Sequence, residues 1–406
     1  MTISRLSTLG QYQQSLNSLL SQQQSLGRTF QQISSGSRLA TGMDDPMAAG
    51  QAVQLNRAID QSSQRSFNAS SLDGRLTRQE SALSEAGDLV SRARSLIIQA
   101  GSPSTSTSDK QNISKEVDSI RDQLVSIANT DDGAGRYLFG GAQDRNAPFS
   151  VNGSSVEYNG DQTQRQISIS SDLNVSDTFP GSEVFLRIPN GDGTLNVTAN
   201  KNNTGSGTIA DFAVNDMSAL SQSSFNIVFK DSGHYDITDS NNKVLQSGAI
   251  DNNSDSEKTT IRFSGTQITL QGTPAQGDSF QSALAKNQDI FSILSNFSQN
   301  LKASTTTEGQ SSLQQNSFQD SLRSISNAEQ HLLNLRVQGG SAQNAIDSAK
   351  DSNDQKNLLA KKDLSSIQDV DYAKALTSYN QQRTALDAAQ RVFSQMQQMS
   401  LFKYLS

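Results

Sequence analysis

Cysteine and histidine, two side chains that commonly bind metals or take part in nucleophilic catalysis, are absent or scarce in this sequence. It has no cysteine and only two histidines, His234 and His331, which lie far apart in regions of different composition. Neither histidine belongs to an H-E-x-x-H or comparable spacing, so the sequence predicts no metal site built on histidine or cysteine. The glycine-rich stretch GAGRYLFGG lacks the G-x-G-x-x-G spacing and is typical of turns, so we expect no cofactor.

The adjacent carboxylates Asp44 and Asp45 are the pair that most resembles an acid–base site. The motif DDP, however, places Asp45 directly before Pro46. This is the pattern of an N-cap followed by a proline at the first helical position, and the positive end of a helix dipole stabilises acidic side chains there. We therefore predict a structural role for both carboxylates and no enzymatic activity for the chain.

The composition predicts narrow hydrophobic cores. Apolar residues make up 33% of the 406 residues, and roughly 40% with glycine included, which is below the share typical of compact domains and favours a helical rod. The formal charge of -7 is spread thinly, and no block of lysine and arginine resembles a nucleic-acid-binding surface.

The sequence also contains no segment suited to membrane insertion. It has no stretch of about 18 apolar residues. The N-terminal sequence MTISRLSTLGQYQQ lacks the basic-then-apolar pattern of a cleaved signal peptide. The cytoplasm is therefore the expected location, unless the chain uses another export route.

Both ends of the chain carry apolar residues at spacings of three and four, the pattern of a coiled-coil helix. The N-terminal seam consists of Leu9, Tyr12, Leu16, Leu19, Leu26, Phe30 and Ile33. The C-terminal seam consists of Tyr372, Leu376, Tyr379, Leu386, Phe393 and Met396, followed by Leu401, Phe402 and Leu405 in the last residues. Glutamines rather than charged residues flank the N-terminal seam, so we expect packing on several sides and predict that both seams are assembly interfaces.

Between these ends the pattern changes from helical to strand-like. Four of the six prolines and most glycines lie in the middle, where FNIVFKDSGHYDI, VNGSS and TIRFSGTQITL are typical of β-hairpins. The fold class we predict is mainly α with an all-β insert that forms a small barrel or sandwich. The expected domains are residues 1–41 (N-terminal coiled-coil helix), 42–144 (helical rod, first half), 145–284 (β-rich domain), 285–369 (helical rod, second half) and 370–406 (C-terminal coiled-coil helix).

Several motifs resemble bacterial flagellins and their relatives. The stretch ISSGSRLATGMDDPMAAGQAV is similar to the N-terminal signature of that family, with matches that include Gly36, Arg38, Asp44 and Asp45. Near the other end, GGSAQNAI and DVDYAKAL resemble the family's C-terminal elements. The stretch IANTDDGAGRYLFGGAQDRNAPF and the ending SLFKYLS are similar to the hook-associated protein 3 branch, the hook–filament junction proteins, rather than to filament flagellins. The resemblance covers roughly residues 1–145 and 285–406.

This resemblance implies a structural axial protein that joins the flagellar hook to the flagellin filament and is needed for motility. The partners that it implies are copies of the same chain in a ring of about eleven subunits, hook-associated protein 1, flagellin, an export chaperone at the C-terminus, and the type III export apparatus. It also implies export from the cytoplasm, without a cleaved signal peptide, to the extracellular hook–filament junction. The β-rich domain would face outward and the terminal helices would form the inner tube.

Two alternatives stay open on the sequence alone. One is a minor flagellin of the filament itself, and the other is a phage-tail or fimbrial adhesin whose β domain binds a receptor. A further expectation concerns the ends. A lone terminal helix buries little apolar surface to offset the conformational entropy of ordering it, so residues 1–41 and 370–406 are expected to be disordered in the free subunit and helical after assembly.

Overall fold

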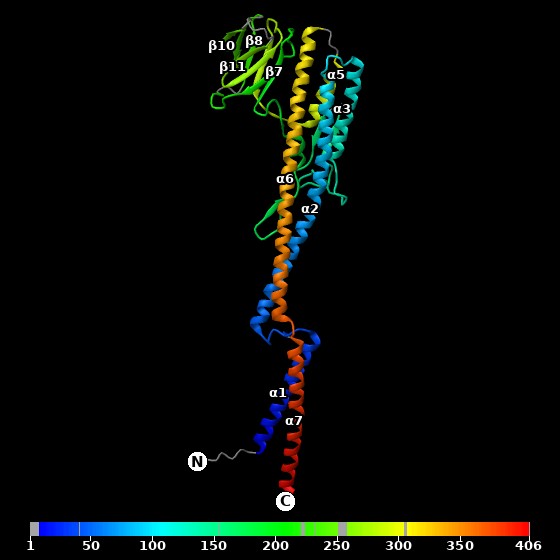
Figure 1. Ribbon diagram of the computed structural model, residues 1–406, viewed down its shortest axis with the longest axis vertical. Coiled ribbons are helices and arrows are strands. Elements are labelled where there is room, and N and C mark those ends of the chain that lie inside the picture. Colours follow the sequence, from blue (N-terminus) through cyan, green and yellow to red (C-terminus); the bar gives the residue numbers. More distant parts are fainter. Residues whose placement is uncertain are drawn as a thin grey trace. The chain divides into compact units, whose positions relative to one another are not determined.

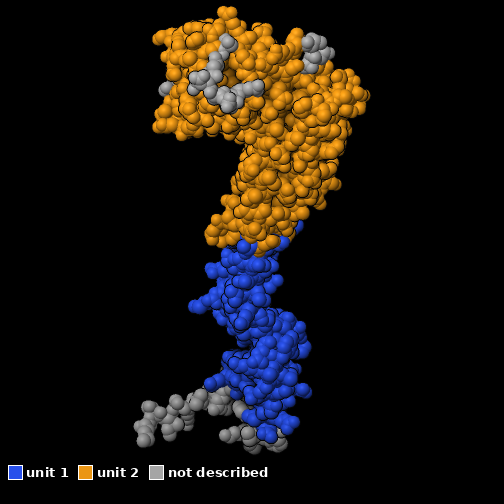
Figure 2. All heavy atoms as spheres, turned by 45° about the horizontal axis from the view of Figure 1, so that its top comes forward, with its two compact units in different colours: residues 1–68, 348–406 blue, residues 69–347 orange. Residues whose placement is uncertain are grey.

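The computed structural model describes residues 8–39, 41–153, 155–220, 224–231, 233–250, 258–303 and 307–405. Within the terminal helices, it describes only the backbone of Thr8, Leu9, Gln11 and residues 396–405. The chain divides into two compact units, residues 1–68 with 348–406, and residues 69–347 (Figure 2). The long helices α2 and α6 contribute residues to both units.

The helices and strands follow the predicted order of helical ends around a β-rich middle (Figure 1). The helices are α1 Thr8–Ser35, α2 Pro46–Ala100, α3 Thr107–Ala128, α4 Gly181–Leu186, α5 Ile290–Lys302, α6 Glu308–Gln368 and α7 Tyr372–Leu405. The strands are β1 Phe149–Asn152, β2 Ser155–Tyr158, β3 Gln166–Ser168, β4 Asn174–Ser176, β5 Ile188–Pro189, β6 Leu195–Ala199, β7 Thr208–Val214, β8 Ser224–Phe229, β9 His234–Thr238, β10 Val244–Ala249, β11 Lys258–Phe263, β12 Thr266–Gln271, β13 Ser279–Leu284 and β14 Asn287–Gln288. This confirms the predicted fold class. In the part of the chain that is described, no helix is long and apolar enough to cross a lipid bilayer.

Helix ends lie where local sequence chemistry predicts them. Gly36 directly follows α1 with a φ of +72°, a left-handed conformation that ends a helix and favours glycine. Asp45 accepts a hydrogen bond from the backbone N–H of Ala48 at 3.0 Å, and α2 begins at Pro46, as the DDP motif predicts. Asp289 caps α5 in the same way, because its Oδ1 accepts from the backbone N–H of Ser292 at 2.6 Å.

The helical core of the second unit is built from α3, α5 and parts of α2 and α6. Its buried residues recur at about seven-residue intervals, as a bundle seam requires. Among them are Leu83, Val90 and Ile97 on α2, Val117 and Leu124 on α3, Leu294 and Leu301 on α5, and Ile325 and Leu332 on α6.

The first part of the predicted β-rich domain shares this helical core. Phe149 on β1 packs edge-on against Phe185 of α4 and Phe291 of α5, with ring centroids 5.6 and 5.5 Å apart. Phe139, in the connection before β1, is fully buried and lies 5.2 Å from Phe185. The aromatic side chains that precede β6 therefore fasten this segment to the helices.

The remaining strands form a separate β-sandwich. Its five-stranded sheet has the order β10-β9-β8-β13-β6 and its three-stranded sheet the order β11-β12-β7, with every neighbouring pair antiparallel. Phe225 of one sheet meets Phe263 of the other with ring centroids 5.0 Å apart. The hairpins predicted at FNIVFKDSGHYDI and TIRFSGTQITL are confirmed as β8–β9 and β11–β12, and the alternative of a barrel gives way to a sandwich.

Polar side chains on one stripe of α6 hold the sandwich and its connections. Asn316 accepts a hydrogen bond from the backbone N–H of Ile209 at 2.7 Å. Arg323 places its guanidinium carbon 4.6 Å from the centre of the Phe212 ring. Asn327 donates to the carbonyl oxygen of Pro189 at 2.8 Å. Hydrogen bonds and a cation–π contact thus join the sandwich and its connections to α6.

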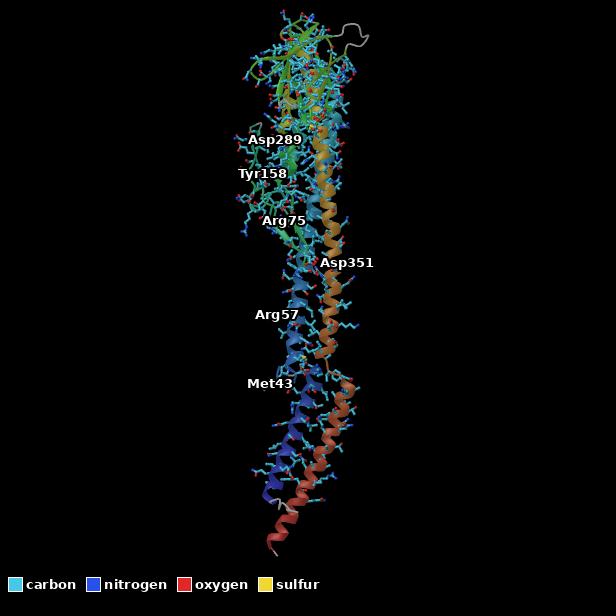
Figure 3. The ribbon with its side chains drawn as sticks, turned by 90° about the vertical axis from the view of Figure 1, so that its left-hand side faces the viewer. Met43, Arg57, Arg75, Tyr158, Asp289 and Asp351 are labelled. Atoms are coloured by element: carbon cyan, nitrogen blue, oxygen red, sulfur yellow. The ribbon has the colours of Figure 1, made fainter. Side chains whose placement is uncertain are left out.

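A buried group of charges ties the segment after α3 to α2. Arg75 on α2 (Figure 3) is only 4% exposed, and its Nε lies 3.0 Å from Asp177 Oδ1. Its Nη1 lies 3.5 Å from Asp144 Oδ2 and 3.6 Å from Asp132 Oδ2. Arg165 adds a second cation, with Nη2 at 2.6 Å from Asp144 and 2.7 Å from Asp177. Buried charges are tolerated only when they are paired in this way.

The ionised form of Asp132 is favoured in the folded chain. Burial by itself would raise the pKa of Asp132. Hydrogen bonds from the backbone N–H groups of Ala134 and Arg136, together with the charges of Arg136 and Arg75, outweigh burial and hold the pKa below its usual value of 3.8. The carboxylate therefore stabilises the fold above that value, and this stabilisation is lost as the pH falls through the folded-state pKa.

We predict that Arg75→Met destabilises the second unit by about 3–5 kcal/mol at neutral pH, because it leaves three buried carboxylates with too few cations. The difference from the unchanged chain shrinks as the pH falls through the lowered folded-state pKa of Asp132, because that carboxylate then takes up a proton. Urea unfolding followed by circular dichroism at several pH values measures both effects.

Arg92→Met is the matched control. Arg92 also lies on α2 and pairs with Glu116 at 2.7 Å, but its side chain is 58% exposed. We expect its loss to change the free energy of unfolding by less than about 1 kcal/mol. Equal effects of the two substitutions would show that the buried charge group does not fasten the fold.

Candidate assembly surfaces at the chain termini

The two predicted seams lie against each other in the first unit. Helices α1 and α7 run side by side (Figure 1) and antiparallel, because Tyr12 near the start of α1 meets Phe393 late in α7, with ring centroids 5.2 Å apart. Phe30 near the end of α1 lies 6.2 Å from Tyr379, early in α7. The structure therefore brings together apolar residues more than 340 positions apart in the sequence.

One buried polar contact joins the same two helices. Thr29 is 8% exposed, and its hydroxyl donates to Oε1 of Gln382 at 3.0 Å. Neither residue belongs to the predicted seams, because a threonine and a glutamine break the apolar pattern. They form this hydrogen bond because the packing of α1 against α7 places them opposite each other.

The described seam residues remain partly open to solvent. Tyr12 is 43%, Phe30 57% and Leu376 54% exposed. Leu16 and Tyr372 are also exposed, while Leu19, Leu26, Ile33, Tyr379, Leu386 and Phe393 are half-buried. Each helix of a pair buries only one stripe of side chains against the other helix, so the rest of a wider apolar face stays exposed to solvent.

A groove of about 700 Å³ separates part of α1 from α7. It is lined by Gln14, Ser15, Ser18, Leu19, Ala389, Val392 and Phe393. Seam residues thus form part of the wall of an open space.

The buried apolar residues of the first unit are small. Among the residues described there, those less than 10% exposed are all alanines: Ala48, Ala52, Ala349 and Ala375. The second unit buries seven phenylalanines almost completely. The described side chains of the first unit therefore form no hydrophobic core, whereas those of the second form two.

Some predicted seam members cannot be placed at the level of side chains. The side chains of Leu9, Met396, Leu401, Phe402 and Leu405 lie outside the described part of the chain, although the backbone of α7 is helical to Leu405. Their role in assembly stays a prediction.

The family-signature residues lie at a joint between the two ends of the chain, which we call the terminal joint (residues 36–45 and 367–371). The backbone N–H of Arg38 donates to the carbonyl of Gln368 at 2.7 Å, and that of Val370 donates to the carbonyl of Gly36 at 3.0 Å. Ser37 and Asp369 form an antiparallel bridge between them. The breaks after α1 and after α6 are thus paired with each other.

Arg38 links two helix ends within this joint. Its Nε and Nη2 donate to the carbonyl oxygen of Ile367, in the last turn of α6, at 3.0 and 2.8 Å. Its Nη1 lies 3.6 Å from Oδ2 of Asp45, the residue that caps α2. A cation suits the negative end of α6 and an acid suits the positive end of α2, so one ion pair serves both helices.

The other acidic residues of the joint are also used as hydrogen-bond acceptors. Oδ2 of Asp44 accepts from the backbone N–H of Thr41 at 2.7 Å. Asp371, which begins the DYA element, accepts from the backbone N–H groups of Ala373 and Lys374 at 3.1 Å and so caps α7. This favours the structural interpretation of the Asp44–Asp45 pair.

Comparison with known proteins now identifies the class. Residues 6–144 match the bacterial flagellin N-terminal helical region, and residues 322–405 match the bacterial flagellin C-terminal helical region. The two matches contain the seam residues and the whole terminal joint. The chain belongs to the flagellin class of axial proteins of the bacterial flagellum.

The particular family follows from full-length relatives. The flagellar hook-associated protein 3 of Escherichia coli (strain K12) is 24% identical over 399 residues, which cover 98% of this chain and 99% of that protein. The crystal structure of Xanthomonas campestris FlgL matches with a TM-score of 0.71 and 36% identity, over 77% of this chain and 99% of that one. The flagellin of Serratia marcescens is 34% identical, but over only 29% of this chain. The chain belongs to the flagellar hook-associated protein 3 (FlgL) family and is a structural protein of the flagellum.

We predict that Arg38→Ala loosens the terminal joint by about 1 kcal/mol, because it removes charge-assisted hydrogen bonds at a half-exposed site. Hydrogen exchange measured by mass spectrometry, in an osmolyte that favours compact states, should then be roughly fivefold faster on both sides of the joint. The peptides to follow are those that contain Gly36 and Val370.

Arg57→Ala serves as the matched control for this experiment. Arg57 lies on α2 in the same unit (Figure 3) and is exposed. Its removal should leave exchange at the joint unchanged. Identical exchange in the two variants would contradict the role assigned to Arg38.

Proposed function

We propose that the chain joins the hook to the flagellin filament by packing its α1–α7 seams against those of neighbouring subunits. The observation that carries this proposal is the apolar seam of the first unit, which stays half exposed beside a groove. The buried apolar residues described in that unit are all alanines. Contiguous exposed apolar surface of this kind marks a protein–protein interface. The second unit, with its own cores, supplies the stable body.

This arrangement and the family support a proposal for the partners. Repeated head-to-tail contacts between identical subunits close into a ring or continue as a helix, and we propose a ring of about eleven copies. Hook-associated protein 1 would contact one side of the ring and flagellin the other. Before export through the type III apparatus, a chaperone would cover the C-terminal seam in the cytoplasm, and no cleaved signal peptide or enzymatic activity is required.

The relatives favour the junction role over a minor flagellin. The match to a hook-associated protein 3 spans nearly the whole chain and includes the β-rich middle, whereas matches to three flagellins cover 29–42% of it. No observation favours the alternative of a phage-tail or fimbrial adhesin, since the terminal helices match the axial proteins.

We further propose that α1 and α7 become ordered only on assembly. In the free subunit, limited proteolysis should remove residues before about 41 and after about 369 at least tenfold faster than it cuts the second unit, because few contacts oppose local opening there. Mass spectrometry of the resistant fragment measures the boundaries. Resistance of both ends in the free subunit, equal to that of residues 69–347, would contradict ordering on assembly.

Deleting the gene tests the junction role itself. Cells without it should carry hooks but no filaments and should release flagellin into the medium, and the full chain supplied from a plasmid should restore swimming. Electron microscopy and flagellin immunoblots of the medium measure this. Filaments that persist in the deletion strain would instead identify a minor flagellin.

Complementation also tests the C-terminal seam. A chain truncated after Gln398 should be exported but should not support filament growth, because it lacks Leu401, Phe402 and Leu405. A chain lacking only Ser406 is the control and should restore swimming. Normal filaments in cells that carry the first truncation would show that these three residues are not needed at the assembly interface.

A further inference from the structure

Three asparagine–glycine pairs occur in the chain: Asn152–Gly153, Asn159–Gly160 and Asn190–Gly191. This dipeptide can undergo an intramolecular reaction, in which the backbone nitrogen of the glycine attacks the side-chain amide carbon of the preceding asparagine. Glycine permits the attack since it has no Cβ to obstruct it. The reaction requires the backbone to leave its folded conformation locally, so the surrounding structure decides which pair reacts.

The first pair lies at the tip of the β1–β2 hairpin and has little to hold it. Asn152 is exposed and pairs with Ser155 as the last rung of the hairpin. Gly153 has a φ of +65°, and a Cβ built on it would meet no atom within 4 Å. Among the described residues the only side-chain contact at Asn152 reaches its backbone carbonyl, which accepts from the Ser155 hydroxyl at 2.9 Å. Its side-chain amide is therefore free to turn toward Gly153.

The second pair is held at both residues. The side-chain amide of Asn159 donates to the Ser150 hydroxyl at 2.9 Å, and its backbone N–H donates to the carbonyl of Pro148 at 2.7 Å. A Cβ built on Gly160 would lie 2.6 Å from the Tyr158 ring, so the glycine is closely packed. Opening here breaks two hydrogen bonds and a ring contact.

The third pair is held still more firmly. The side-chain oxygen of Asn190 accepts from the backbone N–H of Lys286 at 2.7 Å, and the Asn190 N–H donates to the Lys286 carbonyl at 3.0 Å. A Cβ on Gly191 would lie 2.0 Å from the carbonyl oxygen of Leu195. The Gly191 carbonyl also accepts from Asn327 of α6 at 3.0 Å.

We propose that Asn152 is a site of spontaneous deamidation, the one of the three pairs that the fold leaves reactive. A bond forms between the Gly153 nitrogen and the side-chain carbon of Asn152, and the bond from that carbon to its amide nitrogen breaks. The proton of the Gly153 N–H leaves with the amide nitrogen as ammonia. Water from the solvent then opens the resulting succinimide at either carbonyl, which yields aspartate or isoaspartate at position 152.

The modification changes the outer end of the hairpin. Both products place a carboxylate at the tip, and isoaspartate also lengthens the backbone by one methylene group. The added length disturbs the Asn152–Ser155 rung and the next rung, Val151–Val156, while Phe149 stays anchored in the helical core. The share of subunits modified at the hairpin tip thus rises with time, while the helical core stays folded.

Prolonged incubation of the purified full chain in mildly alkaline buffer tests the proposal. Peptide mapping by mass spectrometry, with isoaspartyl methyltransferase labelling, should find modification at Asn152 on the order of tenfold or more above that at Asn159 and Asn190. In concentrated urea the three pairs should react at similar rates, because only the fold separates them. Asn152→Gln should abolish the main signal and confirms its assignment.

Two results would overturn the proposal. Similar rates at the three pairs in the folded chain would show that the hairpin tip is as protected as the other sites. An excess at Asn152 that persists in urea would assign the difference to the neighbouring sequence and not to the structure.

Discussion

Two helices packed side by side cannot bury an apolar face that is wider than one stripe. The α1–α7 pair shows this limit directly, since Tyr12, Phe30 and Leu376 are each between two-fifths and three-fifths exposed although they lie at or near the contact. Hydrophobic burial is the main favourable term in folding and association, so covering this surface would lower the free energy of the chain. The exposed seams are the physical basis of the assembly proposed above.

The second unit buries its large apolar side chains and pairs its buried charges within itself. The terminal helices of the first unit leave much of their apolar surface exposed. Its helical core and its sandwich bury phenylalanines almost fully, and the Arg75 group neutralises the charges that the fold takes out of water. The two units therefore differ in how they bury apolar surface. The second unit has two hydrophobic cores, while the first carries the partly exposed seams and holds only alanines as buried apolar residues where the side chains are described.

The terminal joint gives a physical reason for each residue of the family signature. Gly36 takes a positive φ that ends α1, and Arg38 reaches the last carbonyls of α6 with a guanidinium that can donate in two directions. Asp45 caps α2 and pairs with the same guanidinium. These contacts join the chain segment after α1 to the segment after α6. The residues of the family signature thus end one helix, contact the end of a second and cap the start of a third.

The sequence by itself determined the features that depend on neighbouring residues. The helices that carry the seams, the start of α2 at Asp45–Pro46 and the β8–β9 and β11–β12 hairpins depend on local sequence, and each was predicted correctly. The tertiary structure alone decided which groups meet. The carbonyls of Ile367 and Gln368 that receive Arg38 are backbone atoms without a sequence signal, and Arg75 finds its carboxylates more than fifty residues away. The β-rich middle divides between two cores for the same reason, because the partners of Phe149 lie on α4 and α5 and no local pattern encodes a contact over that distance.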